Sequence, residues 1–118
     1  MNKVAIIVLA DTESHGDLGR VVNALEGVKE FKVAGDDVTL IFDGAGVKWV
    51  KELSNPDHKA APLFAAVKDK VAGACEFCAG AFGVKQATLA AGVKMLGDHE
   101  GHPSFRTLVS GGYQVITF

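Results

Sequence analysis

The sequence predicts an α/β fold, a three-layer α/β/α sandwich around a five-stranded, mainly parallel sheet. Short apolar segments alternate along the chain with segments whose apolar residues recur at helical spacing, and this alternation is typical of parallel sheets with helices on both faces. Residues 4–9 contain no polar position, as expected of a strand that is covered on both sides. The 118 residues suffice for one domain with one core, so we expect a single domain over 1–118.

The first strand, helix and second strand are clearly patterned. The strand at 4–9 leads through a polar turn into a helix that begins near Asp17, whose charge suits the first turn of a helix. The apolar residues of this helix follow helical spacing: Leu18, Val21, Val22, Leu25 and Val28. Gly35 lies beyond the end of the helix, and the second strand, at 38–42, closes at Asp43.

Two helices separate the second strand from the third. A short helix is predicted over 47–53 and stops near Pro56, and a longer one is predicted over 60–71. Gly73 opens the third strand, which we expect to run through both cysteines of the chain and to end at Cys78.

The last third of the chain continues the alternation. A helix predicted over 82–91 is capped by Gly92, and a short strand follows at 93–96. Pro103 fits the first turn of a final helix, and the last strand is predicted at 113–118.

Four loops should meet at one edge of this sheet. Ligands and reactive groups of parallel sheets gather beyond the carboxyl ends of the strands. We call the loops expected there the rim loops: 10–16, 43–46, 78–83 and 97–102. Three of them carry ionisable side chains, and the fourth carries Cys78.

Composition excludes several classes of partner. The net charge of −2 gives no reason to expect a nucleic acid, and no apolar run approaches the roughly 18 residues that a membrane helix needs. Two cysteines do not make a disulfide framework, and the chain shows no secretory signal. We therefore expect a cytoplasmic protein with free thiols.

The two cysteines, Cys75 and Cys78, have the spacing of a redox pair or of half a zinc site. No second pair accompanies them, so we expect no metal. On a strand, residues three apart face opposite sides, so the two thiols should not meet, although a disulfide stays open. We expect Cys75 to be buried and Cys78 to react, because N–H groups at the start of the next helix favour a thiolate.

Other rim residues are candidates for a pocket around Cys78: Asp11, His15, Asp43, Gly80 and Lys85. Lys85 is either a source of positive charge near the thiolate or a solvated surface lysine. Gly80, which has no side chain, lets backbone amides approach the sulfur. His99 and His102 have a spacing that permits metal binding, but the sequence shows no further ligands beside them. The chain has no dinucleotide-binding fingerprint, so no cofactor is expected.

Several segments together resemble the DsrE family of small sulfur-relay proteins. They are 11–20, 36–46, the cysteine segment 75–85 and the terminal segment 111–118. The resemblance implies a three-layer domain that forms homo-oligomers, often trimers or hexamers. It also places the cysteine that carries sulfur as a persulfide at Cys78 and implies other sulfur-transfer proteins as partners.

Two functions follow from these expectations. The first is an intracellular sulfur relay, in which the protein acts as a sulfurtransferase or a sulfur carrier through Cys78. The alternative is a non-enzymatic module that binds a small ligand or anion at helix amino ends, with Cys78 lining the pocket. For the oligomer, the apolar residues Trp49, Phe64 and Phe105 are candidates for an exposed patch.

Overall fold

A computed structural model describes residues 1–118 and contains a five-stranded sheet in the order β4-β3-β2-β1-β5. Every strand pair is parallel, which confirms the predicted fold class. The strands are β1 (Lys3–Val8), β2 (Asp37–Phe42), β3 (Val71–Cys75), β4 (Met95–Leu96) and β5 (Gln114–Thr117). The α-helices are α1 (His15–Val33), α2 (Trp49–Leu53), α3 (Ala61–Val67), α4 (Glu76–Ala81), α5 (Lys85–Ala90) and α6 (Phe105–Ser110). Short 3-10 turns are η1 (Gly44–Lys48) and η2 (Lys68–Lys70).

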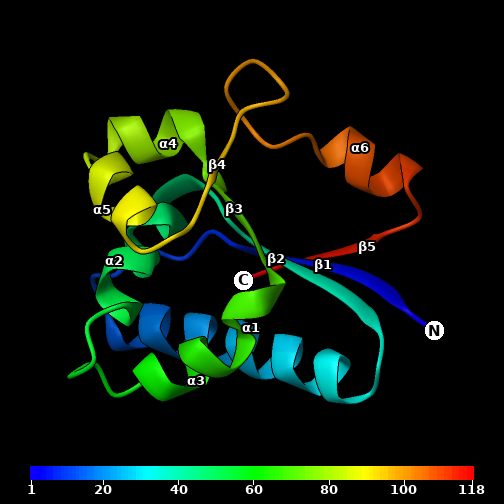
Figure 1. Ribbon diagram of the computed structural model, residues 1–118, viewed down its shortest axis with the longest axis horizontal. Coiled ribbons are helices and arrows are strands. Elements are labelled where there is room, and N and C mark those ends of the chain that lie inside the picture. The colour runs from blue at the N-terminus through cyan, green and yellow to red at the C-terminus, as the bar shows by residue number, and fades with distance from the viewer.

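Strand β1 is covered on both faces, as its unbroken apolar sequence predicts. Ile6 and its alternate neighbours join the large core that α1 and α3 cover, whereas Ala5 and Ile7 join a smaller cluster on the other face. Leu108 of α6 packs against that smaller cluster. In Figure 1, α1 and α3 lie on one side of the sheet and α6 lies on the other. The middle strand of the sheet is β2, with β1 between β2 and β5.

Helix α1 is fixed by a cap and by an apolar stripe. The Ser14 side chain accepts a hydrogen bond from the Asp17 N–H at 3.1 Å, so the helix begins slightly earlier than predicted. Its buried residues follow helical spacing: Val21, Ala24, Leu25 and Val28. Each buried Val or Leu of this kind stabilises the fold by about 1.5–3 kcal/mol. Neither this helix nor any other is both long and apolar enough to cross a membrane.

Two of the three residues expected on an exposed patch belong to the core. Trp49 and Phe64 are each only 3% exposed. The Trp49 indole N–H donates to the Ala10 carbonyl at 2.9 Å, and the Phe64 ring meets Phe42 edge to face at 6.1 Å between centroids. Phe105, on α6, is exposed as expected.

The cysteine segment differs from its prediction. Strand β3 ends at Cys75, and α4 begins at the next residue, so the expected continuation of the strand to Cys78 is wrong. The helix expected over 82–91 is present as α5, but it begins later, at Lys85. Cys75 itself caps α4, because its Sγ accepts the Cys78 N–H at 3.4 Å. The apolar Phe77 suggested a buried strand, but its side chain is 60% exposed on the helix.

Candidate functional site

Four side chains that offer metal- or proton-binding atoms meet at the carboxyl edge of the sheet. They are Asp43, Cys75, Cys78 and His102, and their ligand atoms all lie within 4.8 Å of one another. We call them the thiol cluster. They come from the carboxyl ends of β2, β3 and β4, which are neighbours in the sheet: Asp43 follows β2, Cys75 ends β3, Cys78 lies in α4, and His102 follows β4. The cluster lies where β3 runs into α4, beside the loop from β4 to α6 (Figure 1).

Cys75 is the buried member of the thiol pair, with 0% of its surface exposed. Its Sγ lies 3.3 Å from Nδ1 of His102 and 3.8 Å from the Gly101 carbonyl oxygen. Burial raises the pKa of the Cys75 thiol to about 12, and the nearby Asp43 carboxylate acts in the same direction. Cys75 is therefore a neutral thiol at neutral pH, as expected of a buried cysteine.

Cys78 lies in the first turn of α4 and is only partly buried. Its thiol donates to Oδ1 of Asp43 at 3.8 Å. The expectation that the two thiols point apart is wrong, because the chain has already turned from strand to helix between them. Cys78 is thus the cysteine that solvent can reach.

The first N–H groups of α4 are directed away from the Cys78 sulfur. The Phe77 N–H donates to the Gly101 carbonyl at 2.9 Å, and the Cys78 N–H donates to Cys75 Sγ at 3.4 Å. Helix α4 also has only six residues, so its dipole is small. The contact expected between these N–H groups and the Cys78 sulfur is therefore not made, and the hydrogen bond of the Cys78 thiol runs to the Asp43 carboxylate instead.

Asp43 is held by the turn after β2. Its Oδ1 accepts the Gly44 N–H at 2.8 Å, and the residue is 8% exposed. The turn presses against the end of β1, since a Cβ built on Gly46 would lie 2.0 Å from the Val8 carbonyl oxygen. Only glycine permits this close approach, which fixes the Asp43 carboxylate over Cys78.

His102 reaches the cysteines through a tight turn. The backbones of His99 and His102 are joined by two hydrogen bonds, of 2.9 and 2.8 Å. Glu100 and Gly101 between them have φ of 51° and 87°, the positive values that a type I′ turn requires. The Phe77 ring packs 4.9 Å from the His102 ring and holds it in place.

The sequence analysis did not predict His102 as a metal ligand, because no further metal-binding residues lie near it in the sequence. The sequence did offer one indication that His102 lies near the cysteines, namely its position in a rim loop. Three of the four rim loops each contribute one residue to the thiol cluster. Of the five predicted pocket residues, Asp43 alone belongs to the thiol cluster.

Asp11 and His15 lie apart from the cysteines. The Asp11 carboxylate pairs with Lys48 at 2.5 Å, and the hydrogen bond from Lys48 lowers the pKa of Asp11. His15 is exposed at the start of α1 and lines a separate hollow with Trp49 and His58.

Gly80 and Lys85 also lie outside the thiol cluster. Gly80 is exposed on α4, and no atom would lie within 4 Å of a Cβ built there. Lys85 pairs with Glu76 at 3.6 Å, so its charge is shared with a carboxylate rather than with a thiol.

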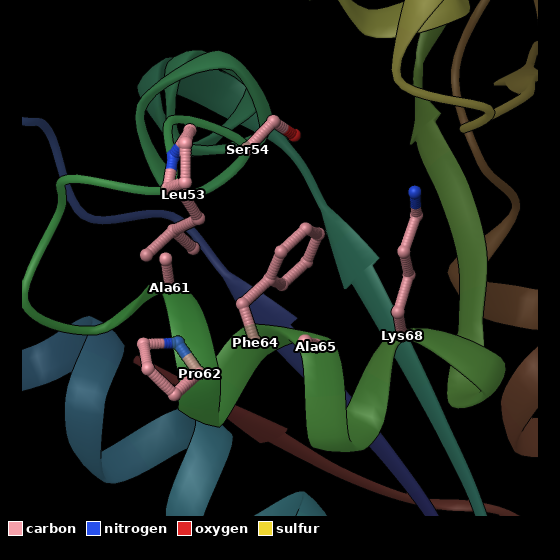
Figure 2. Close-up of a pocket in the computed structure, with 8 residues that line it drawn as sticks. Leu53, Ser54, Ala61, Pro62, Phe64, Ala65 and Lys68 are labelled. Carbon is pink, nitrogen blue, oxygen red and sulfur yellow. The ribbon is translucent and has the colours of Figure 1, made fainter.

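An open hollow of about 600 Å³ adjoins the thiol cluster. Asp43 and His102 line it together with residues of the loop before α6 and of its first turn: His99, Pro103, Ser104, Phe105 and Arg106. A second hollow, of about 390 Å³, lies between α2 and α3, where Figure 2 shows the Phe64 ring standing between Leu53 and Lys68. No cysteine or histidine lines the second hollow, so we assign the chemistry to the first.

The fold and the thiol cluster define a small α/β protein with an accessible cysteine at the carboxyl edge of a parallel sheet. The chain belongs to the DsrE/DsrF-like family, whose model matches residues 2–118. The resemblance inferred from the sequence is thereby confirmed.

Two individual proteins are similar to this chain. An uncharacterized protein of Methanocaldococcus jannaschii is 34% identical over 96 residues, which are 81% of this chain and 78% of that protein. A conserved protein of unknown function from Bacteroides thetaiotaomicron has a similar solved structure, with a TM-score of 0.62 and 16% identity. The match covers 97% of this chain and 94% of the other, and it shows a shared fold.

Proposed function

We propose that this protein is an intracellular sulfur carrier that holds sulfane sulfur as a persulfide on Cys78. The observation that carries the proposal is the difference in access between the two thiols of one cluster. Cys75 is fully buried, whereas Cys78 is partly exposed. Membership of the DsrE/DsrF-like family, to which the sulfur-relay proteins belong, supports the same function.

The proposed transfer is an exchange between thiols without net oxidation. The Cys78 thiolate attacks the outer sulfur of a donor persulfide, a new S–S bond forms, and the donor leaves as a thiolate. The reverse reaction with an acceptor thiol returns Cys78 to its starting state. Partners are therefore proteins with reactive cysteines in a reducing, cytoplasmic compartment.

The thiol cluster offers groups suited to this exchange. The Asp43 carboxylate accepts a hydrogen bond from the Cys78 thiol and orients its sulfur. The His102 ring, whose Nδ1 lies 3.3 Å from Cys75 Sγ, places a nitrogen that can accept or donate a hydrogen bond beside the two thiols. The open hollow beside Asp43 and His102 gives a partner chain room to approach.

Binding of an anion at a helix start is less favoured. Two N–H groups of the first turn of α4, those of Phe77 and Cys78, already have partners within the protein. These two N–H groups at the start of α4 are therefore not available to bind an anion.

Sulfur loading of single variants tests the carrier function. The reduced protein is mixed with a persulfide donor, and its intact mass is measured. Cys75→Ser should gain the mass of one sulfur atom as the wild type does, whereas Cys78→Ser should gain none. Loading of Cys78→Ser but not of Cys75→Ser would reverse the assignment, and no loading of the wild type would end the proposal.

We also propose that the protein forms a homo-oligomer, a trimer or hexamer, through α6 and β5. Strand β5 is an edge of the sheet, and α6 has no buried residue. Phe105, Val109 and Ile116 of these two elements are exposed apolar residues. A second copy of this chain would bury these residues and cover the face of the sheet on which α6 lies.

A further inference from the structure

We propose that the thiol cluster is a binding site for a thiophilic divalent cation of the zinc class, with Asp43, Cys75, Cys78 and His102 as its four ligands. Their ligand atoms all lie within 4.8 Å of one another. The sequence argued against such a site because two cysteines lacked further ligands, and the fold supplies those ligands from the neighbouring rim loops. The inference does not depend on the sulfur-carrier function, because metal binding requires no sulfur donor.

The geometry is close to that of a tetrahedral zinc site. Zinc bonds of roughly 2.0–2.3 Å to oxygen, nitrogen and sulfur place the ligand atoms about 3.3–3.8 Å apart at the tetrahedral angle. Cys75 Sγ and His102 Nδ1 are 3.3 Å apart, and Cys78 Sγ and Asp43 Oδ1 are 3.8 Å apart. Since no pair of ligand atoms exceeds 4.8 Å, a contraction of about 1 Å by side-chain rotation completes the site.

The chemistry of the ligands selects the class of metal. Two sulfurs, one imidazole nitrogen and one carboxylate oxygen suit zinc and similar ions, whereas magnesium and calcium require oxygen ligands. Both cysteines bind as thiolates, so two protons leave when the metal enters. The bound cation then balances charges that would be unfavourable at the buried Cys75 and Asp43 positions.

Neighbouring groups already orient each kind of ligand. The Cys78 N–H donates to Cys75 Sγ at 3.4 Å, and the Gly44 N–H donates to Asp43 Oδ1 at 2.8 Å. The Phe77 ring fixes the His102 ring at 4.9 Å. Such outer contacts are a regular feature of metal sites. The hollow beside Asp43 and His102 provides the path of entry.

A bound metal and a persulfide would exclude one another at Cys78, because both use the same sulfur. The metal-bound form is thus a state in which the thiols are shielded from sulfur donors and from alkylation.

Titration with Co²⁺ tests the site. The full chain is reduced, stripped of metal with a chelator and titrated with Co²⁺, and Zn²⁺ is then added to displace the cobalt. We expect one equivalent of Co²⁺ to give the intense visible bands of tetrahedral cobalt and a thiolate-to-cobalt charge-transfer band in the near ultraviolet. Weak octahedral bands without charge transfer would overturn the proposal.

Single variants identify the ligands. Cys78→Ser and His102→Ala should each weaken binding by more than about 100-fold, since loss of an outer-shell partner alone costs roughly 10–100-fold. The matched control is His15→Ala, because His15 is exposed at the start of α1 and lies outside both the cluster and the hollow beside it. It should bind Co²⁺ as the wild type does.

Circular dichroism of the metal-free variants checks that each is folded. Asp43→Asn, which keeps the shape of the side chain, is the third ligand variant and should also weaken Co²⁺ binding. Equal weakening by His15→Ala and His102→Ala, or full binding by Cys78→Ser, would overturn the assignment.

Discussion

Cys75 and Cys78 are separated by two residues in the sequence, yet they lie in different chemical environments. Cys75 is buried against the His102 ring and the Gly101 carbonyl, whereas Cys78 borders solvent in the first turn of α4. The sequence correctly predicted the burial of Cys75 from its apolar neighbours. It could not show that the two thiols meet, because that depends on where the strand ends.

The difference between the thiols predicts selective alkylation. Burial raises the pKa of Cys75 to about 12 from an ordinary 9.0, so Cys75 keeps its proton at every pH below that range and gains reactivity only in strong alkali. With iodoacetamide near neutral pH, Cys75→Ser should be alkylated at the wild-type rate, and Cys78→Ser should stay unmodified. Raising the pH to about 10 should leave Cys78→Ser largely unmodified as well. Intact mass against time checks this, and rapid labelling of Cys78→Ser at neutral pH would contradict it.

At the scale of elements, the thiol cluster depends on the junction of β3 with α4 and on the turn at 99–102. The start of α4 was mispredicted because local sequence does not favour it. Gly80 lowers helix propensity, and the exposed Phe77 resembles a strand residue. The hydrogen bond from the Phe77 N–H to Gly101 fixes the helix start, and this contact joins segments far apart in the chain.

The turn that carries His102 should be sensitive to substitution. Gly101 has φ of 87°, a conformation that costs an L-residue roughly 1–2 kcal/mol. Gly101→Ala should therefore lower the free energy of unfolding by about that amount, as measured by urea denaturation. It should also weaken contacts between His102 and Cys75, which a shift in the His102 NMR resonances would report.

The matched control for that substitution is Gly19→Ala on α1. Gly19 has no neighbour within 4 Å of a built Cβ and no positive φ. Alanine there should raise the free energy of unfolding by up to about 1 kcal/mol, because it favours the helix. An equal destabilisation by both substitutions would show that the turn geometry is not the cause.

At the scale of the whole molecule, the alternation of apolar segments was enough to predict the parallel sheet and its helical layers. It was not enough to predict which rim residues meet. The loop after β1 is tied to its neighbours by Trp49, whose indole N–H reaches the Ala10 and Asp11 carbonyls, and by the Asp11–Lys48 ion pair. These contacts hold Asp11 away from the thiol cluster, and no sequence pattern reveals them.

The proposed homo-oligomer predicts a mass above that of the monomer in light scattering at micromolar concentration. Phe105→Glu combined with Val109→Lys should dissociate it, because both residues are exposed on α6, the proposed interface. Val33→Glu, at the exposed end of α1, is the matched control and should leave the mass unchanged. A monomer mass for the wild type would contradict the proposal.

Locating the transferred sulfur in the wild-type protein tests the central claim most directly. Trypsin cuts after Lys70 and Lys85 and so releases one peptide that contains both cysteines. After exposure to a persulfide donor and alkylation, fragmentation between Cys75 and Cys78 separates the two positions. Our account predicts the added sulfur on the fragments that contain Cys78 alone. Added sulfur on Cys75, with Cys78 carrying only the alkyl group, would contradict it.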